Sequence, residues 1–163
     1  MTKKTTAVLR KINRLNRRLD KKSKNRVVAS RGNLYKFDAS FCITGIGLNP
    51  DAITLKTGLS PTHTHIAGEF RSKFSKIPYQ EDMWSLRSPL ERSVSLDEHI
   101  AWLWCQINPH KQYLAEVISK STSAYIILGC LTESPYPILD ISFESTKILK
   151  ELNLSLAFNF TCV

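Results

Sequence analysis

Two histidines stand one residue apart in the segment SPTHTHIAGE, residues 60–69, and they are the residues that most resemble a chemical site. Successive side chains of a β-strand point to opposite faces, so His63 and His65 would share one face. A zinc or iron centre would need at least a third ligand. The candidates for that ligand lack any motif spacing; they are Glu69, His99, Cys105 and His110. We therefore predict no metal, and either an ordinary strand or a polar binding patch that includes His63, His65 and Glu69.

Motifs of nucleophilic or nucleotide-dependent catalysis are missing from the sequence. It contains no G-x-S-x-G elbow, no P-loop, no G-x-G-x-x-G and no H-E-x-x-H. Gly45 and Gly47, in TGIGLNP, lie between a predicted strand and a predicted helix, a position where some proteins bind phosphate. Two glycines without the rest of a phosphate-binding fingerprint are better explained by turn geometry. We expect a protein that is not an enzyme, with no catalytic residue and no cofactor.

The cysteines and the hydropathy pattern bear on the compartment. Cys42, Cys105, Cys130 and Cys162 have no paired spacing, so we interpret them as buried, reduced thiols rather than a disulfide framework. No apolar run approaches the ~18 residues of a membrane-spanning helix. The N-terminal residues lack the apolar core of a secretory signal. Together these observations favour a cytoplasmic protein without a transmembrane segment.

The positive charge of the chain is concentrated at one end. The 163 residues carry a net charge of +9. Residues 1–36 contain 13 Lys and Arg and one acid, Asp20, which is a net +12, whereas residues 37–163 contain 10 basic and 13 acidic side chains, a net −3. Gly32 and Asn33 mark a turn near the point of change. We predict a basic arm, residues 1–35, followed by one mildly acidic domain, residues 36–163.

The arm has the pattern of a short amphipathic helix. Val8, Ile12, Leu15 and Leu19 recur at helical spacing and form one apolar stripe. Three interpretations remain open: a helix packed on the domain, an arm that binds nucleic acid by releasing counterions from phosphates, or a contact with an acidic protein or an anionic membrane surface. The candidate contact residues are Arg10, Lys11, Arg14, Arg17, Arg18, Lys21 and Lys22.

The domain alternates predicted strands and helices. Residues 36–45 alternate apolar and polar side chains, which indicates a half-buried strand. Asn49 is the expected cap of a helix that ends at Gly58, with Ile53 and Leu55 as its main apolar residues. The other expected elements are strands at 62–68, 82–88, 123–131 and 154–163, helices at 110–120 and 142–152, and a polar, basic loop at 69–81. In the last strand, Leu154, Leu156, Phe158 and Phe160 are expected on one face.

The segment SVSLDEHIAWLWCQI, residues 93–107, predicts the longest helix. Ser95 and Glu98 form a capping box, in which each side chain satisfies an orphan backbone N–H group. Apolar residues follow at helical spacing and include Trp104, which we expect to be buried against the sheet. Trp102 falls outside that stripe. If exposed, it is a further candidate for the binding patch.

Two parts of the chain share one order of elements. Residues 40–66 and 124–160 each run strand, loop, capped helix, strand. This order suggests two related βαβ-type halves. We predict an α+β fold with a single mixed sheet of five to six strands and helices packed on one face.

The same segments resemble a known family. FDASFCITG, LNPDAITLKTGLSPTHTHIAGE, MWSL, SLDEHIAWLWCQINPHKQYLAEV and ILKELNLSLAFNF follow one another as in the bacterial domain of unknown function 4279 family. The resemblance covers about residues 36–163 and leaves the basic arm outside. It implies a small bacterial α+β domain without an established activity, and it supplies no catalytic residue.

Two classes of function follow from these observations. The first is a module that binds a partner protein, of the immunity or adaptor type. The second is a protein associated with nucleic acid through its basic arm, with the domain as a scaffold.

Overall fold

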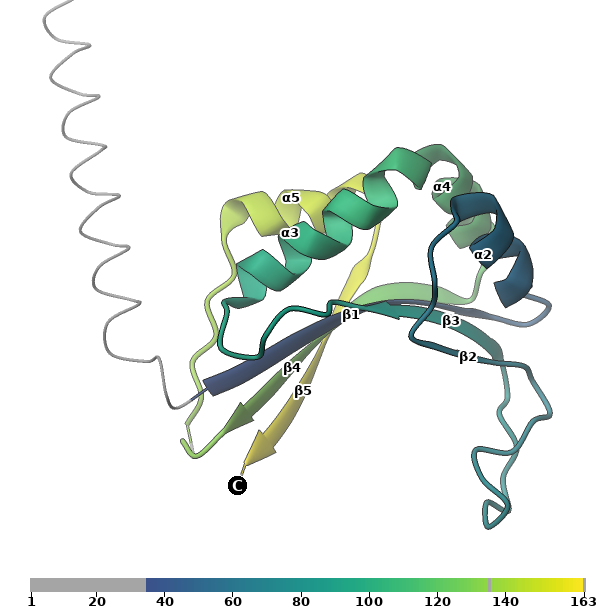
Figure 1. Cartoon of the computed structure of the whole chain (residues 1–163), viewed down its shortest axis with the longest axis horizontal. Helices are drawn as coiled ribbons and strands as arrows, with labels where there is room; N and C mark the ends of the chain where they lie inside the picture. The colour runs from purple at the N-terminus through teal and green to yellow at the C-terminus, as the bar shows by residue number, and fades with distance from the viewer. Residues whose placement is uncertain (1–34, 135, 163) are drawn as a thin grey trace, which may run out of the picture. The chain divides into compact units, whose positions relative to one another are not determined.

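One mixed sheet and the helices on it make up the part of the chain that the computed structural model describes, residues 35–134 and 136–162. The elements are β1 (Tyr35–Gly45), α2 (Pro50–Thr57), β2 (His63–His65), β3 (Asp82–Arg87), α3 (Leu96–Ile107), the 3₁₀ helix η1 (Asn108–His110), α4 (Lys111–Lys120), β4 (Ser123–Thr132), α5 (Phe143–Glu151) and β5 (Ser155–Cys162). Figure 1 shows the helices on one face of the sheet, which confirms the predicted α+β class. The helix predicted for the basic arm lies outside the described residues.

The strand order is β2-β3-β1-β4-β5. β3 runs antiparallel to both β1 and β2, whereas β5 runs parallel to β4. β4 starts where β1 ends, since the Thr122 N–H donates to the Thr44 carbonyl at 2.9 Å, and later in β4 Gly129 lies against Asp38 near the start of β1. β1 and β4 are therefore antiparallel. The sheet is mixed and has five strands, as the sequence predicted.

Both predicted strand–helix–strand units are visible in the topology. β1 and β2 are parallel to each other because each is antiparallel to β3, which lies between them. β4 and β5 are parallel neighbours. In the first unit, β3 lies between the two parallel strands, whereas in the second unit the two parallel strands are direct neighbours. The kinship of the two halves remains a prediction.

Sequence-encoded caps set the helix ends. The Asn49 side chain accepts a hydrogen bond from the Ala52 N–H at the start of α2, and Gly58 ends that helix with a φ of 66°. Ser95 and Glu98 form the predicted capping box of α3. Ser142 caps α5 by accepting from the Ser145 N–H. Each cap satisfies a backbone donor that the helix itself leaves unpaired.

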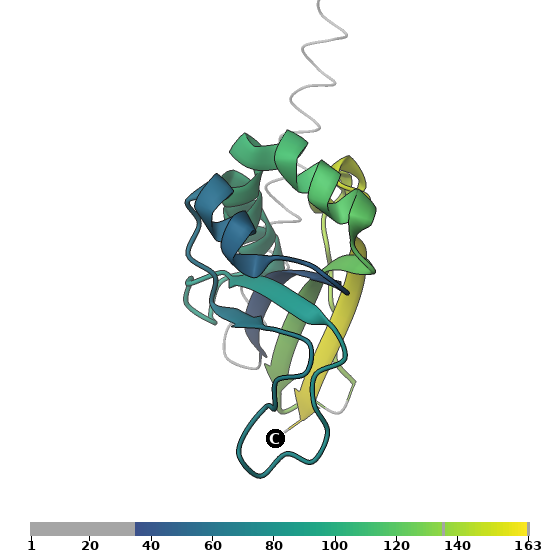
Figure 2. The same ribbon diagram turned by 90° about the vertical axis from the view of Figure 1, so that its right-hand side faces the viewer.

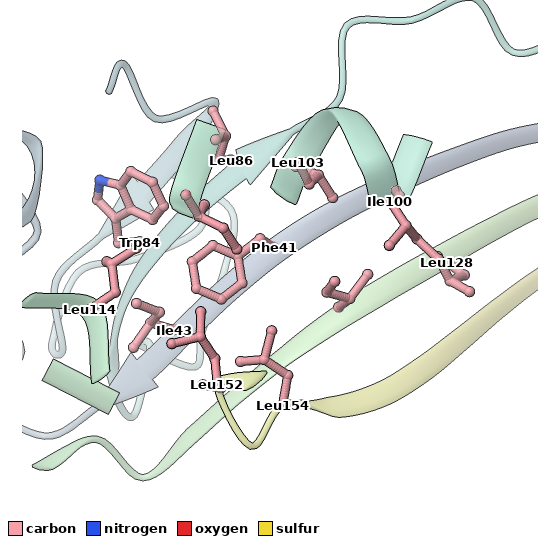
Figure 3. Packing of buried hydrophobic residues seen from close by; sticks show 14 of the residues in the cluster. Phe41, Ile43, Trp84, Leu86, Ile100, Leu103, Leu114, Leu128, Leu152 and Leu154 are labelled. Atoms are coloured by element: carbon pink, nitrogen blue, oxygen red, sulfur yellow. The ribbon is translucent and has the colours of Figure 1, made fainter. Parts of the chain in front are cut away.

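The core lies between the sheet and α3 (Figure 3). Phe41 and Ile43 of β1 stand opposite Leu86 and Trp84 of β3 in the antiparallel register. The ring centroids of Phe41 and Trp84 are 6.2 Å apart in an edge-to-face arrangement. On the helix side, Ile53 of α2 and Leu114 of α4 join one buried stripe of α3: Leu96, His99, Ile100, Leu103 and Ile107.

Two expectations about burial were wrong. Trp104 is half-buried, because His99 rather than Trp104 completes the buried stripe of α3. Cys105 and Cys162 are exposed, while only Cys42 and Cys130 are buried as expected.

The second face of β1 also differs from the expected half-buried pattern. Thr44, on the polar face of the predicted strand, is buried, and so is Cys42 on the same face. Cys42 Sγ lies 3.2 Å from Ser85 Oγ of β3. β1 is the middle strand of the sheet, so neighbours on both sides shield its polar face as well as its apolar one.

The packing of α3 gives a first prediction. Leu103→Ala should lower the free energy of unfolding by about 2–5 kcal/mol, because it removes a fully buried side chain and leaves a cavity. Leu55→Ala removes the same atoms from an exposed site and should change stability by less than about 0.5 kcal/mol. Chemical denaturation of both variants measures the difference. Equal losses would contradict the helix phase described above.

The buried His99 gives a second prediction. Its Nδ1 hydrogen-bonds with Ser88 Oγ at 3.0 Å, and its Nε2 has no hydrogen-bond partner among the described residues. Burial lowers the pKa of His99, and the carboxylates of Asp38 and Glu98 oppose this shift only in part. Below the unfolded pKa of about 6.5, the unfolded chain takes up a proton that the folded chain resists. Stability should therefore be complete above this pH and fall as the pH decreases.

The variant His99→Gln should flatten this pH dependence, since it removes the titrating group and keeps a polar partner for Ser88. His110→Gln, on a half-exposed residue of η1, serves as the control. The measurement is urea unfolding between pH 5 and 8, the range in which an ordinary histidine titrates. An unchanged acid-side slope in His99→Gln would show that another group is responsible.

Candidate functional site

The connection between β2 and β3 is a long loop, residues 66–81, that extends away from the sheet (Figures 1 and 2). Loops of this length are uncommon inside small domains and are often functional. Residues 66–70 and 78–82 approach each other and form a neck. Residues 71–77 form a tip beyond it. Neck and tip together form the 66–81 loop.

Backbone and carboxylate hydrogen bonds close the neck. The Gly68 N–H donates to the Tyr79 carbonyl at 2.9 Å, and the Tyr79 N–H donates to the Glu69 carbonyl at 2.8 Å. The Asp82 carboxylate, which is buried, accepts from the Ala67 N–H at 2.8 Å. Gly68 has a φ of 89°, a conformation that favours glycine. The neck is therefore a defined structure that holds the tip at a fixed place.

The Glu69 side chain has a role in the same turn. Its Oε2 accepts a hydrogen bond from the Ile66 N–H at 2.9 Å, and its own N–H donates to the Ile66 carbonyl at 3.1 Å. Glu69 thus binds both the N–H and the carbonyl of Ile66 and closes the turn that contains Gly68. This is a structural use of a residue that the sequence placed in a polar binding patch.

His63 and His65 lie at the root of the 66–81 loop. His63 Nε2 is 3.1 Å from His65 Nδ1, a hydrogen-bond distance, and the two rings are on one side of β2 as predicted. The His65 ring stacks on Tyr79 with a centroid distance of 3.6 Å and an interplanar angle of 9°. Partial burial lowers the pKa of His65, and the neighbouring His63 adds to the effect. A neutral His65 ring that packs on the neck agrees with both observations.

The tip combines apolar and cationic side chains. Phe74 is 82% exposed and Ile77 is 74% exposed. Three cations, Arg71, Lys73 and Lys76, are neighbours of this pair in the sequence, and Lys73 Nζ lies 5.1 Å from the centre of the Phe74 ring. The Ser75 hydroxyl donates to the Ile77 carbonyl at 2.9 Å, which is one of the bonds that fold the tip into a turn. The sequence indicated only a polar, basic loop and did not reveal its exposed apolar pair.

The structure brings together three of the four residues proposed for the binding patch. His63, His65 and Glu69 lie at the root and neck of the 66–81 loop. Trp102 lies on α3 instead, where it is half-buried and packs against the core. Within residues 35–134 and 136–162, no group of three His, Cys, Asp or Glu side chains is arranged to hold a metal ion. The candidate cations of residues 1–34 lie outside the described part of the chain.

The glycines of TGIGLNP line a small pocket beside the start of α2. It has a volume of about 190 Å³ and lies between the β1–α2 turn and α4, where Tyr113, Val117 and Lys120 face it. Gly47 has a φ of 76°, and a Cβ on Gly45 would lie 3.1 Å from the Thr122 backbone nitrogen. Turn geometry and close backbone approach thus account for both glycines.

The fold and the described surface define a small α+β domain with one helix-covered sheet and a projecting loop. The family model of a domain of unknown function, DUF4279, matches residues 33–162. The chain therefore belongs to this family, as its resemblance indicated. No curated protein and no solved structure matches the chain. In the residues that the structure describes, no helix has the length and apolar character to cross a membrane.

The neck of the 66–81 loop gives a third prediction. Asp82→Ala should speed hydrogen exchange at the Ala67 amide and lower the free energy of unfolding by about 1–3 kcal/mol, because a partly buried hydrogen bond to a charged acceptor is lost. Asp82→Asn keeps an oxygen acceptor at the same position and should retain most of the protection. Amide exchange followed by mass spectrometry checks both variants. Equal protection in Asp82→Ala and the unaltered protein would show that the neck does not depend on this carboxylate.

Proposed function

We propose that this protein is a non-enzymatic module that binds a partner protein through the tip of the 66–81 loop. The observation that carries the proposal is the exposed pair Phe74 and Ile77 on a loop whose neck is fixed by hydrogen bonds. Exposed apolar side chains rimmed by polar groups mark interaction sites, and aromatic anchors contribute most to binding.

The charges of the tip indicate the chemistry of the partner. Arg71, Lys73 and Lys76 stand within a domain whose residues 37–163 carry a net −3. A partner with acidic side chains around an apolar groove would accept the Phe74 ring and pair with these cations. The folded turn and fixed neck reduce the entropy lost when the tip is immobilised. An immunity or adaptor protein of a bacterial cytoplasm, which occupies and blocks one partner, fits this description.

A fourth prediction follows from the tip. Replacing Phe74 and Ile77 together by Ala should weaken capture of a stoichiometric protein partner by tenfold or more, since a buried anchor side chain is worth about 2 kcal/mol or more. Leu55→Ala, equally exposed but on α2, is the matched control and should bind as the unaltered chain does. The readout is quantitative affinity capture after nuclease treatment, followed by a direct titration with the protein recovered. Unchanged affinity in the double variant would exclude the tip as the binding surface.

A second candidate function rests on the charge of residues 1–36, which is a net +12. Such a density of Lys and Arg favours binding to phosphate backbones with little sequence preference. In this alternative the domain is a scaffold and residues 1–35 contact nucleic acid.

A fifth prediction separates the two candidates. Changing the seven candidate cations to Gln should weaken any binding to duplex DNA or RNA in the full chain by tenfold or more, because it lowers the net charge of residues 1–36 from +12 to +5; they are Arg10, Lys11, Arg14, Arg17, Arg18, Lys21 and Lys22. In the unaltered protein, the log of the affinity should fall with the log of salt concentration by about 0.9 per neutralised phosphate on duplex DNA. Fluorescence anisotropy at several salt concentrations measures both effects. The absence of salt-dependent binding at low ionic strength would reject the alternative and leave the protein-binding proposal standing.

A further inference from the structure

β5 is a long, open edge of the sheet. The strand order places β5 at one edge and β2 at the other, and β2 is only three residues long. β5 runs for eight residues and is paired on one side, with β4. An edge strand presents a row of backbone N–H and C=O groups that another strand can satisfy. Within the described residues, no strand pairs with the outer side of β5.

The side chains of β5 lack the features that protect most edge strands. Natural edges are blocked by Lys or other charges, by Pro, by bulges or by short length. The sequence SLAFNFTC contains no charged residue and no Pro, and its register with β4 is unbroken over all eight residues. Residues 158–162 are exposed one after another, so both faces of this half of the strand are open. The edge is therefore suited to pairing, and nothing in residues 35–134 and 136–162 blocks it.

Two phenylalanines add an apolar surface to the open edge. Phe158 and Phe160 stand beside Leu128 and Cys130 of β4, on the face that carries the helices. The two rings stack with centroids 6.0 Å apart, and they remain 47% and 49% exposed. Figure 1 shows why: the ends of β4 and β5 extend beyond the helices that cover the rest of the sheet. The predicted apolar face of this strand exists, but at Phe158 and Phe160 none of the described helices covers it.

We propose that β5 pairs antiparallel with β5 of a second copy of this chain, about a two-fold axis at Asn159. In this register Phe158 of one copy stands opposite Phe160 of the other, and the reverse pair forms on the far side of the axis. Residues directly opposite each other in antiparallel strands point to the same face, so the four rings gather on one surface. The two Asn159 side chains meet at the axis on the other face, where each amide can donate to the other.

The second copy is the partner that the observations favour. A two-fold interface uses the same patch twice, so the patch must be complementary to itself. β5 meets this condition because it carries no charge that would repel its own copy, although the whole chain has a net charge of +9. Phe158 and Phe160 are equally spaced about Asn159, so a two-fold axis at Asn159 places each Phe opposite a Phe of the second copy. The inference is independent of the proposed function, because β5 and the 66–81 loop are separate segments at separate strands of the sheet.

The first test is the oligomeric state of the full chain, treated with nuclease to remove nucleic acid. Analytical ultracentrifugation over a dilution series should show a monomer–dimer equilibrium. Asn159→Lys places two like charges against each other at the axis and should raise the dimer dissociation constant by about tenfold or more. Thr64→Lys, exposed on the opposite edge strand, is the matched control and should leave the constant unchanged. A chain that remains monomeric at every concentration would overturn the proposal, as would equal weakening by both variants.

The second test fixes the register. In a background with the exposed Cys105 and Cys162 changed to Ser, Asn159→Cys should form a disulfide-linked dimer under mild oxidation, because residues at the axis lie about 4.5–5.5 Å apart and within disulfide range. Thr161→Cys, exposed on the same face, stands opposite Ala157 of the second copy and should remain unlinked. Cross-linking of Thr161→Cys to the same extent would overturn pairing about Asn159.

Discussion

The structure depends on the burial of one face of the sheet beneath α3. Ile100, Leu103 and Ile107 present a continuous apolar stripe to a surface of the sheet that includes Phe41 and Trp84, and all five are fully buried. Burying a large apolar side chain is worth about 1.5–3 kcal/mol, so this single layer of contacts outweighs any surface ion pair in the domain. The capping box at Ser95 fixes the residue at which α3 begins, and the buried stripe of the helix follows from there.

A sheet covered on one face leaves the other face to be satisfied by polar contacts. Arg87 Nη2 lies 2.7 Å from an oxygen of Asp38, and Arg92 lies 3.7 Å from the same oxygen. Gly129 makes room for this arrangement, because a Cβ there would lie 2.4 Å from Asp38 Oδ1. The same one-sided construction leaves β5 partly uncovered, since the helices end before the strand does.

The 66–81 loop is held on the domain by contacts that begin in the core. Trp84 Nε1 donates to Thr54 Oγ1 at 3.1 Å, which fixes α2 against β3, and β3 in turn carries the neck of the loop. The tip therefore stands at the end of a chain of ordered contacts that begins in the core. Exposed apolar residues on such a support are available to a partner without first being ordered.

Local chemistry let the sequence alone determine most elements of the domain. Caps at Asn49, Ser95 and Ser142, and the strand periodicity, depend on groups a few residues apart, so their signals are complete in a short segment. Only the tertiary structure decided which side chains are covered: it buried His99, half-exposed Trp104, and exposed Phe74 and Phe158. Coverage depends on how far each helix extends over the sheet and where a loop leaves it. Both depend on contacts between residues that are far apart in the sequence, so a short sequence pattern cannot predict them.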